Sequence, residues 1–337
     1  YLDIVTAGNE KVLEARLNDA EFFYQEDVKY PLEQKVELLK PVVFQESLGT
    51  MYQKVTRISE LTEYLADSFK LSPNAREMAR KAARLAKADL VSNMVYEFPE
   101  LQGIMGYYYA LHDNQPEEVA AAIKEHYQPR FSGDSLPAST VGTVVAMADK
   151  MDTICGCFAV GIRPTGAGDP YALRRQAQGI CLMAAEGQMD IDILKAVDKG
   201  LELYKKQGLM LDEIEVRNAV KEFFKQRTAN LLEDKGVSYD VINCVLESSW
   251  NVIVETKARA QALMEFKGNQ HYQELMTSYT RAANLAKNAM GDQVVASLLH
   301  EAPEKKLWEK FQEIRENSAV LWHDERYMEI LEEYASL

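Results

Sequence analysis

The stretch KAARLAKADLVSNMV, residues 81–95, shows the pattern that governs most of this chain. Apolar residues recur in it at close to helical spacing, at Ala82, Leu85, Ala86, Leu90, Val91 and Met94. Asp89 stands in the middle of this pattern, and a carboxylate on a buried helical face is costly unless it is paired, hydrogen-bonded or bound to metal. The stretch predicts a helix over 75–96 and raises the question of what Asp89 does there.

The same spacing recurs along the chain. In residues 8–27, Leu13, Leu17, Ala20 and Tyr24 step by four, three and four. Further helices are predicted at 42–49, 50–70, 99–112, 116–127, 139–161, 190–207, 211–235, 238–247, 250–267, 271–290 and 303–323. Alternating strand patterns are almost absent, so the sequence predicts an all-α fold.

The length of 337 residues is enough for two ordinary domains. The residues 163–175 form a Pro/Gly-rich loop, in which Asp169 is the expected cap of the next helix and Pro170 its expected first turn. That helix should end at Gly187, a natural terminator. We therefore expect domains at 1–188 and 189–337.

Composition narrows the class of protein. No apolar run is long enough to cross a bilayer, and no secretory pattern is present, so we expect no membrane association. The four cysteines have no disulfide-framework spacing, which fits a reducing cytoplasm. A net charge of −14 argues against extended coating of nucleic acid, but screening over roughly 8–10 Å leaves room for a local basic face. The chain begins with Tyr1 rather than Met, so we expect a piece of a longer protein.

Carboxylates on apolar helices suggest one catalytic class, the metal-dependent phosphohydrolases. Asp149 and Asp152 lie in the apolar helix VVAMADKMDTI, residues 144–154, and could meet Asp89. Such sites mix carboxylates with imidazoles, and the chain has only five histidines. His112 and His126 are expected to be surface or capping residues. We therefore interpret Asp89 and Asp149 as hydrogen-bonded links between helices and predict neither a metal site nor catalytic residues; a nucleotide phosphohydrolase is the alternative.

Other catalytic signatures are absent from the sequence. It has no phosphate-cradling loop of the Walker type and no dinucleotide fingerprint. Cys155 and Cys157 lie on an apolar helix and are expected to be small buried hydrophobic residues.

Four long segments resemble one family, the β subunit of the bacterial two-subunit glycyl-tRNA synthetase. They are GNEKVLEARLNDAEFFYQED (8–27), FPELQGIMGYYYALHD (98–113), VVAMADKMDTICGCFAVGIRPTGAGDPYALRRQAQGI (144–180) and FFKQRTANLLEDKGVSYDVINCVL (223–246). The phrases FPELQGIMG and PTGAGDPYALRR are long and unusual in composition, so a chance match is improbable.

The resemblance implies an HD-like helical domain followed by a helical anticodon-binding domain that is truncated at its C-terminal end. By resemblance, the ligand positions of the HD superfamily fall on Gln45, Ala88, Asp89 and Asp149, a degenerate site without its histidines. It also implies that the α subunit attaches glycine to tRNA-Gly with ATP and Mg, within an α2β2 tetramer. The β chain would bind tRNA and need no cofactor of its own.

The second half of the chain offers residues that suit RNA. Arg217, Lys221 and Lys225 step by four along one helix side, with Arg227 close by. Residues 281–287 place Arg281, Asn284 and Lys287 at successive threes; Arg and Lys supply phosphate contacts, and Asn and Arg can read unpaired bases.

Three further residues have other expected roles. Tyr279 is expected to be a core residue rather than a stacking surface. Arg174 and Arg175 are expected either to join the two domains or to contact the tRNA backbone. A third class of function, a helical scaffold for the α subunit, also fits the sequence.

Overall fold

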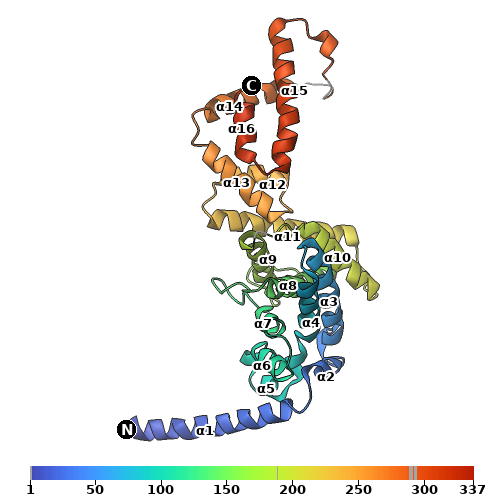
Figure 1. Cartoon of the computed structure of the whole chain (residues 1–337), viewed down its shortest axis with the longest axis vertical. Coiled ribbons are helices and arrows are strands. Elements are labelled where there is room, and N and C mark those ends of the chain that lie inside the picture. Colours follow the sequence, from blue (N-terminus) through green and yellow to red (C-terminus); the bar gives the residue numbers. More distant parts are fainter. Residues whose placement is uncertain (1, 188, 288–290, 292–293) are drawn as a thin grey trace. The chain divides into compact units, whose positions relative to one another are not determined.

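The computed structural model describes residues 2–187, 189–287, 291 and 294–337, which form sixteen α-helices, three 3-10 helices and one two-stranded sheet (Figure 1). The prediction of an all-α chain is confirmed. Within the described residues, no helix is both long enough and apolar enough to span a membrane. The chain divides into two compact units, Tyr1–Arg227 and Thr228–Leu337.

The first unit is built around one central helix. Its elements are α1 (Leu2–Asp27), α2 (Leu32–Glu37), β1 (Val43–Gln45), β2 (Gly49–Thr50), α3 (Met51–Ser68), α4 (Pro73–Leu85), η1 (Ala88–Val91), α5 (Asn93–Glu97), η2 (Pro99–Leu101), α6 (Ile104–His112), α7 (Glu117–Glu125), α8 (Thr140–Ala159), α9 (Leu173–Glu186), α10 (Ile193–Lys206) and most of α11 (Glu213–Asp234). Helix α8 is buried from Val141 to Phe158, and α3, α4, α7, α9 and α10 pack around it. A helix that is largely apolar around its circumference is expected at such a central position, although α8 also carries the buried charges of Asp149, Lys150 and Asp152.

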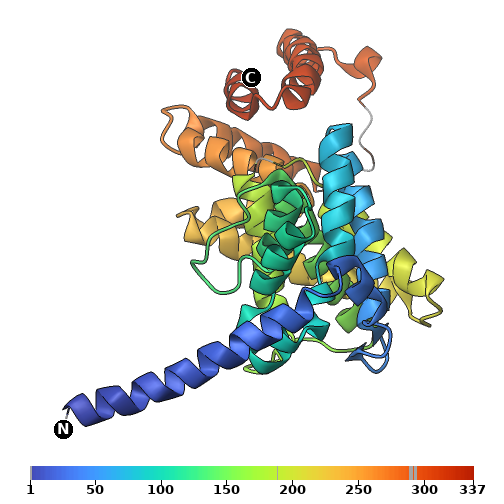
Figure 2. The same cartoon turned by 60° about the horizontal axis from the view of Figure 1, so that its bottom comes forward.

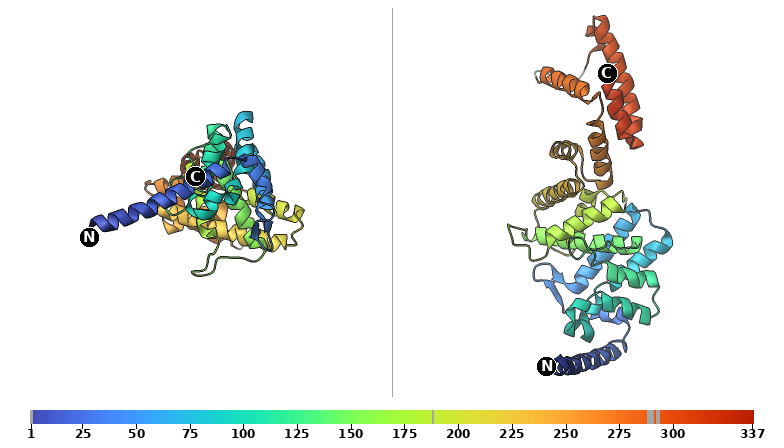
Figure 3. Two further views of the ribbon diagram at one scale, coloured as in Figure 1. Left: turned by 90° about the horizontal axis from the view of Figure 1, so that it is seen from below. Right: turned by 90° about the vertical axis from the view of Figure 1, so that its left-hand side faces the viewer.

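Helix α1 extends away from the other helices of the first unit (Figures 2 and 3). The predicted helix is confirmed, but the side chains of Leu13 and Leu17 are exposed. Its C-terminal end is anchored by Asp27, whose carboxylate accepts hydrogen bonds from the backbone N–H of Met94 at 2.9 Å and from the Tyr109 hydroxyl at 2.8 Å.

The helix predicted over 75–96 is interrupted. Helix α4 ends at Leu85, and α5 starts after Ser92, whose hydroxyl accepts a hydrogen bond from the Val95 N–H at 3.2 Å. The break brings Asp89 to the start of α6, where its Oδ2 accepts hydrogen bonds from the N–H groups of Gly103 and Gly106 at 2.6 and 3.0 Å. Backbone donors that a continuous helix could not offer therefore satisfy Oδ2, whereas the buried Oδ1 has no hydrogen-bond partner among the described residues.

The helix predicted over 42–49 is wrong. Strands β1 and β2 form an antiparallel hairpin in which Val43 is opposite Thr50 and Gln45 is opposite Gly49. Gly49 has a φ of 92°, a conformation that glycine adopts without steric cost. The Gln45 Oε1 accepts hydrogen bonds from the N–H groups of Ser47 and Leu48, so this side chain closes its own turn.

The start of α9 agrees in part with the prediction. Asp169 caps the helix, because its carboxylate accepts hydrogen bonds from the N–H groups of Leu173 and Arg174 at 2.7 and 3.0 Å. Pro170 precedes the helix, which starts at Leu173 rather than at the proline. Gly187 is the C-cap, as expected.

The second unit is a small helical assembly of α12 (Tyr239–Ser248), α13 (Ile253–Phe266), α14 (Tyr272–Ala286), η3 (Ala296–Leu298), α15 (Ala302–His323) and α16 (Tyr327–Ala335). Helix α16 packs against α13, α14 and α15. Leu321, Tyr327 and Ile330 form a buried cluster there. Of the helix predicted over 271–290, residues 288–290 lie outside the described residues.

The division into compact units lies further along the chain than the expected boundary at 188/189. Helix α10 packs against α3 and α8, so residues after 189 belong to the first compact unit. The HD-like and anticodon-binding identities of the two expected domains, 1–188 and 189–337, stay predictions.

Candidate functional site

Charged side chains from α3 and α8 form a buried ion-pair network in the first unit. Lys54 Nζ lies 3.0 Å from both Asp149 Oδ1 and Asp152 Oδ2, and it donates a hydrogen bond to Thr153 Oγ1 at 2.8 Å. Arg57 donates to both oxygens of Asp152, at 2.6 and 3.2 Å. The spacing of three or four residues along each helix brings these groups onto the two facing sides of α3 and α8.

Lys87 completes the network from the turn after α4. Its Nζ donates to Asp149 Oδ2 at 2.8 Å and lies 4.0 Å from the centre of the Tyr127 ring. Burial alone would raise the pKa of Asp149, but Lys54 and Lys87 outweigh it and hold that pKa well below its usual range. Burial lowers the pKa of Lys87, and Asp149 offsets this only in part. Asp149 is therefore a charged carboxylate held between two lysines.

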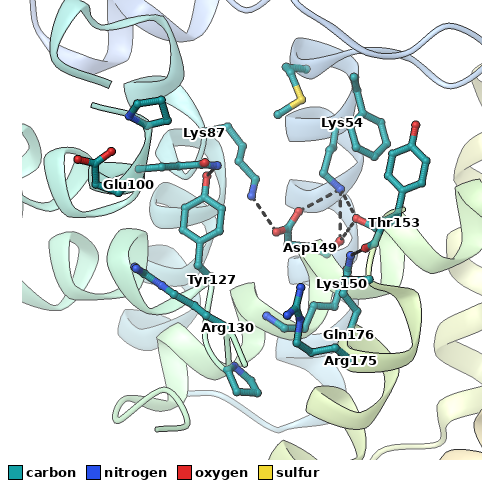
Figure 4. A pocket seen from close by; sticks show the side chains of 17 residues that line it. Lys54, Lys87, Glu100, Tyr127, Arg130, Asp149, Lys150, Thr153, Arg175 and Gln176 are labelled. Carbon is teal, nitrogen blue, oxygen red and sulfur yellow. Dashed lines mark hydrogen bonds and ion pairs between the residues drawn. The ribbon is translucent and has the colours of Figure 1, made fainter. Parts of the chain in front are cut away.

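A cavity of about 450 Å³ opens beside this network (Figure 4). Its lining carries five cationic side chains and two acidic ones, namely Lys54, Lys87, Arg130, Lys150 and Arg175 with Glu100 and Asp149. The rest of the lining includes the rings of Phe44, Tyr127 and Tyr171. The cavity is thus a basic site with aromatic walls.

Lys150 is held in the cavity with no ion-pair partner among the residues that the structure describes. Its Nζ donates hydrogen bonds to the backbone carbonyls of His126 and Gln128, at 3.1 and 2.7 Å. Burial lowers the pKa of Lys150 to about 7, against the smaller opposing effect of Asp149. The protonation of this side chain therefore responds to charge that enters the cavity.

The four degenerate HD positions have different environments in the structure. Gln45 closes its own hairpin turn, and Ala88 is buried without a polar side chain. Asp89 is fully buried and bonded to Gly103 and Gly106, and burial raises its pKa to about 6. Of these positions, only Asp149 lines the cavity.

His126 is a capping residue, one of its two expected roles, but it does not lie at the surface. It is the C-cap of α7, but its ring is fully buried, and its Nδ1 lies 2.6 Å from the carbonyl oxygen of Ile123. Burial lowers the pKa of His126 well below its usual value, and Lys87 adds to this effect. The apolar residues that precede His126 in the sequence of α7 did not indicate that its ring would be buried.

The residues around Asp149 do not fit a metal ion. Both carboxylate oxygens are engaged by lysine ammonium groups, which repel a cation. Among the residues that the structure describes, no three His, Cys, Asp or Glu side chains are placed to hold a metal. A hydrolytic metal therefore has no suitable set of donors here.

The cysteines expected to be small buried hydrophobic residues are so placed: Cys155 and Cys157 are both buried, and burial raises the pKa of each thiol.

The predicted basic residues of α11 belong to the first unit. Arg217 forms an ion pair with Asp198, so part of its charge is offset. Lys221 and Lys225 are half-buried one turn apart. Arg227 stacks over Phe223, with its guanidinium carbon 5.7 Å from the ring centre, and its buried Nε has no hydrogen-bond partner among the described residues.

Arg174 lies near Arg227, whereas Arg175 lies elsewhere on α9. Burial lowers the pKa of Arg227, and the charge of Arg174 lowers it further. Arg175 is exposed and lines the cavity. The structure thus separates two neighbours in the sequence into two different sites.

The predicted residues of α14 lie in the second unit. Arg281, Asn284 and Lys287 are all exposed, and within the described part of the chain none of them forms an ion pair. Tyr279 is 65% exposed, so its expected place in the core is wrong. Its helix has no buried residue within the part described, which leaves the ring at the surface.

The comparison with protein families decides the identity of the chain. The profile described as "Glycyl-tRNA synthetase beta subunit" matches residues 1–247. The chain belongs to this family. The resemblance read from the sequence is therefore confirmed.

Members of this family are similar in sequence to the whole length of this chain. The chain is 45% identical over 339 residues to the glycine–tRNA ligase β subunit of Desulforamulus reducens, covering all of this chain and 49% of the relative. It is 44% identical over 336 residues to the corresponding β subunit of Clostridioides difficile, covering 100% of this chain and 48% of the relative. The chain spans about half the length of the curated relatives it matches.

The basic cavity was missed by the sequence reasoning. Lys54 and Lys150 lie on helices and Lys87 in the turn after α4, places where a lone lysine is usually solvated. A signal was present: Lys87 and Lys150 stand next to Ala88 and Asp149, two of the positions to which the resemblance assigns the HD ligands.

Proposed function

We propose that this chain is the tRNA-binding part of a glycyl-tRNA synthetase β subunit. In this proposal it supports the attachment of glycine to tRNA-Gly, and the α subunit carries out the chemistry with ATP and Mg. The chain itself contributes no catalytic residue. An α2β2 assembly is part of the same proposal.

The observation that carries the proposal is the surface of α14. Arg281, Asn284 and Lys287 step by three, so their side chains lie within one third of the helix circumference. All three are exposed. Such a row offers cations for phosphates and an amide for a base edge, which suits the unpaired bases of an anticodon loop.

Helix α11 gives separate support from the first unit. Arg227 and Arg174 are close enough for the charge of one to lower the pKa of the other. Two like charges near one another favour an anion that neutralises both, and a phosphate of an RNA backbone is such an anion. Arg217 is the weakest member of the predicted set, because Asp198 already engages it.

A titration of the chain with tRNA tests the proposal. Filter binding of tRNA-Gly should weaken as salt rises, because phosphate contacts release counterions, and should exceed the binding of a tRNA with another anticodon. Arg281→Gln should weaken binding by about 1–3 kcal/mol. Arg315→Gln is the matched control, since Arg315 is an exposed arginine of α15 in the same unit.

Two results would count against the proposal. Equal binding of all tRNAs would remove the specificity for tRNA-Gly. An unchanged affinity of the Arg281→Gln chain, with Arg315→Gln as reference, would remove α14 from the interface.

A further inference from the structure

The cavity of the first unit has more positive charge than its own carboxylates offset. Asp149 is shared between Lys54 and Lys87, and Lys54 also contacts Asp152. Arg57, outside the cavity, takes up both oxygens of Asp152. The remaining cations of the lining are Arg130, Lys150 and Arg175, and the remaining acid is the exposed Glu100.

Among the residues that the structure describes, none of these three cations forms an ion pair with a carboxylate. Lys150 donates hydrogen bonds to two backbone carbonyls. Within the described part of the chain, neither the Arg130 nor the Arg175 guanidinium forms an ion pair. In Figure 4 these side chains are drawn below Asp149, with Lys54 and Lys87 above it. Cations from three separate segments therefore converge on one concavity.

Shape and chemistry indicate which anion the concavity suits. A volume of about 450 Å³ lies in the range of small-molecule sites, well above what a bare ion requires. Arginine forks match phosphate geometry, and lysine ammonium groups bind phosphate as point charges. Lys87 lies over the Tyr127 ring and Lys54 over the Phe44 ring, so the Tyr171 ring is the aromatic surface of the lining on which a base can stack.

We propose that the cavity lined by Arg130, Lys150 and Arg175 binds the phosphate group of a nucleotide, with the base against the aromatic wall. The phosphate can come from a free mononucleotide or from the end of an RNA strand. No bond is made or broken in this site. The proposal concerns a part of the chain distinct from α14, so it can fail while the tRNA-binding function stands.

Calorimetric titrations of the chain with AMP, adenosine and inorganic phosphate test the proposal. AMP and phosphate should bind, and adenosine should bind far more weakly because it lacks the phosphate. Arg130→Gln and Arg175→Gln should each weaken AMP binding by about tenfold, the loss expected for one charge-assisted hydrogen bond. Arg80→Gln is the matched control, because Arg80 is an exposed arginine of α4 that does not line the cavity.

Two RNA oligonucleotides distinguish the source of the phosphate. If a 5′-phosphorylated strand displaces AMP and its 5′-hydroxyl counterpart does not, the site accepts an RNA end. If neither strand displaces bound AMP, the site takes the free nucleotide. Both results support the proposal.

Lack of AMP binding at millimolar concentration would overturn it, as would equal affinity for adenosine. An effect of Arg80→Gln as large as that of Arg175→Gln would also overturn it. Arg175 is exposed, so its substitution should leave the thermal unfolding midpoint unchanged, and a loss of binding is then not a loss of fold.

Discussion

Asp152 is the residue whose substitution tests the buried network most sharply. Its side chain is 1% exposed and lies between two cations, with Lys54 Nζ at 3.0 Å and Arg57 Nε at 2.6 Å. Lys54 keeps a second carboxylate, Asp149, when Asp152 is neutralised. Within the described part of the chain, the other partners of Arg57 are neutral groups, among them the Tyr204 hydroxyl. Asp152→Asn therefore leaves the Arg57 charge buried without a counter-ion.

The expected loss of stability follows from this geometry. Removing one partner of a buried ion pair costs about 3–5 kcal/mol, because the other charge stays desolvated. For a unit of this size, 1 kcal/mol corresponds to about 2–4 °C in the unfolding midpoint, so Asp152→Asn should lower the midpoint by roughly 6–20 °C. The matched control is Asp198→Asn. Asp198 forms an ion pair with Arg217, and the two side chains are 43% and 37% exposed, respectively. Such a surface pair contributes at most about 1 kcal/mol.

Thermal unfolding followed by two signals measures the effect. Trp250, Trp308 and Trp322 are the three tryptophans of the chain, and all lie in the second unit. Their fluorescence therefore reports that unit, whereas far-ultraviolet circular dichroism reports both. The dichroism transition should move by far more in Asp152→Asn than in Asp198→Asn. Equal shifts for the two substitutions would refute the reasoning.

Three further predictions concern the same unit. Burial raises the pKa of Asp89 to about 6 from its unfolded value of 3.8, so the native state holds the proton more tightly and the free energy of unfolding falls as the pH rises through about 6. Asp89→Asn should remove this fall, which is roughly 3 kcal/mol, in urea titrations at several pH values. An unchanged pH dependence of the free energy of unfolding would contradict the prediction. Sulfate binding to the cavity, measured by calorimetry, should weaken as the pH rises through about 7, because Lys150, which faces Asp149, Lys54, Lys87 and Asp134, then loses its proton. Lys150→Met should abolish this pH dependence. A wild-type affinity for sulfate that does not vary with pH would contradict the prediction. Gly156→Ala would place a methyl group 2.2 Å from the Tyr204 hydroxyl oxygen, so we expect a loss of about 1–3 kcal/mol in urea unfolding, and a neutral effect would contradict the close packing of α8 on α10.

The helical class of the fold could be predicted because the spacing of apolar residues is a local property. The errors arose where tertiary contacts replaced local ones. Residues 42–49 contain the apolar residues expected of a buried helix, yet Gly49 and the Gln45 side-chain amide close a hairpin there. Asp89 interrupts its helix because its partners, Gly103 and Gly106, lie 14 and 17 residues further along the chain.

The candidate sites were predictable to different degrees. The residues of α14 were found because a surface row shows in the sequence as a regular step, and Arg281, Asn284 and Lys287 are indeed exposed. The cavity was not found, because Lys54 and Lys150 come from helices that pack together only in the folded unit. A long-range charge network leaves no periodic trace in a single sequence.

The most direct test of the central claim, that this chain binds tRNA-Gly through α14, is photo-crosslinking. A tRNA-Gly that carries thiouridine beside its anticodon is bound to the chain and irradiated, and the linked peptides are identified by mass spectrometry. The account predicts links to the peptide that contains Arg281 and Asn284, and their loss when unlabelled tRNA-Gly competes. Links that avoid this peptide, or that appear equally with a tRNA of another anticodon, would contradict it.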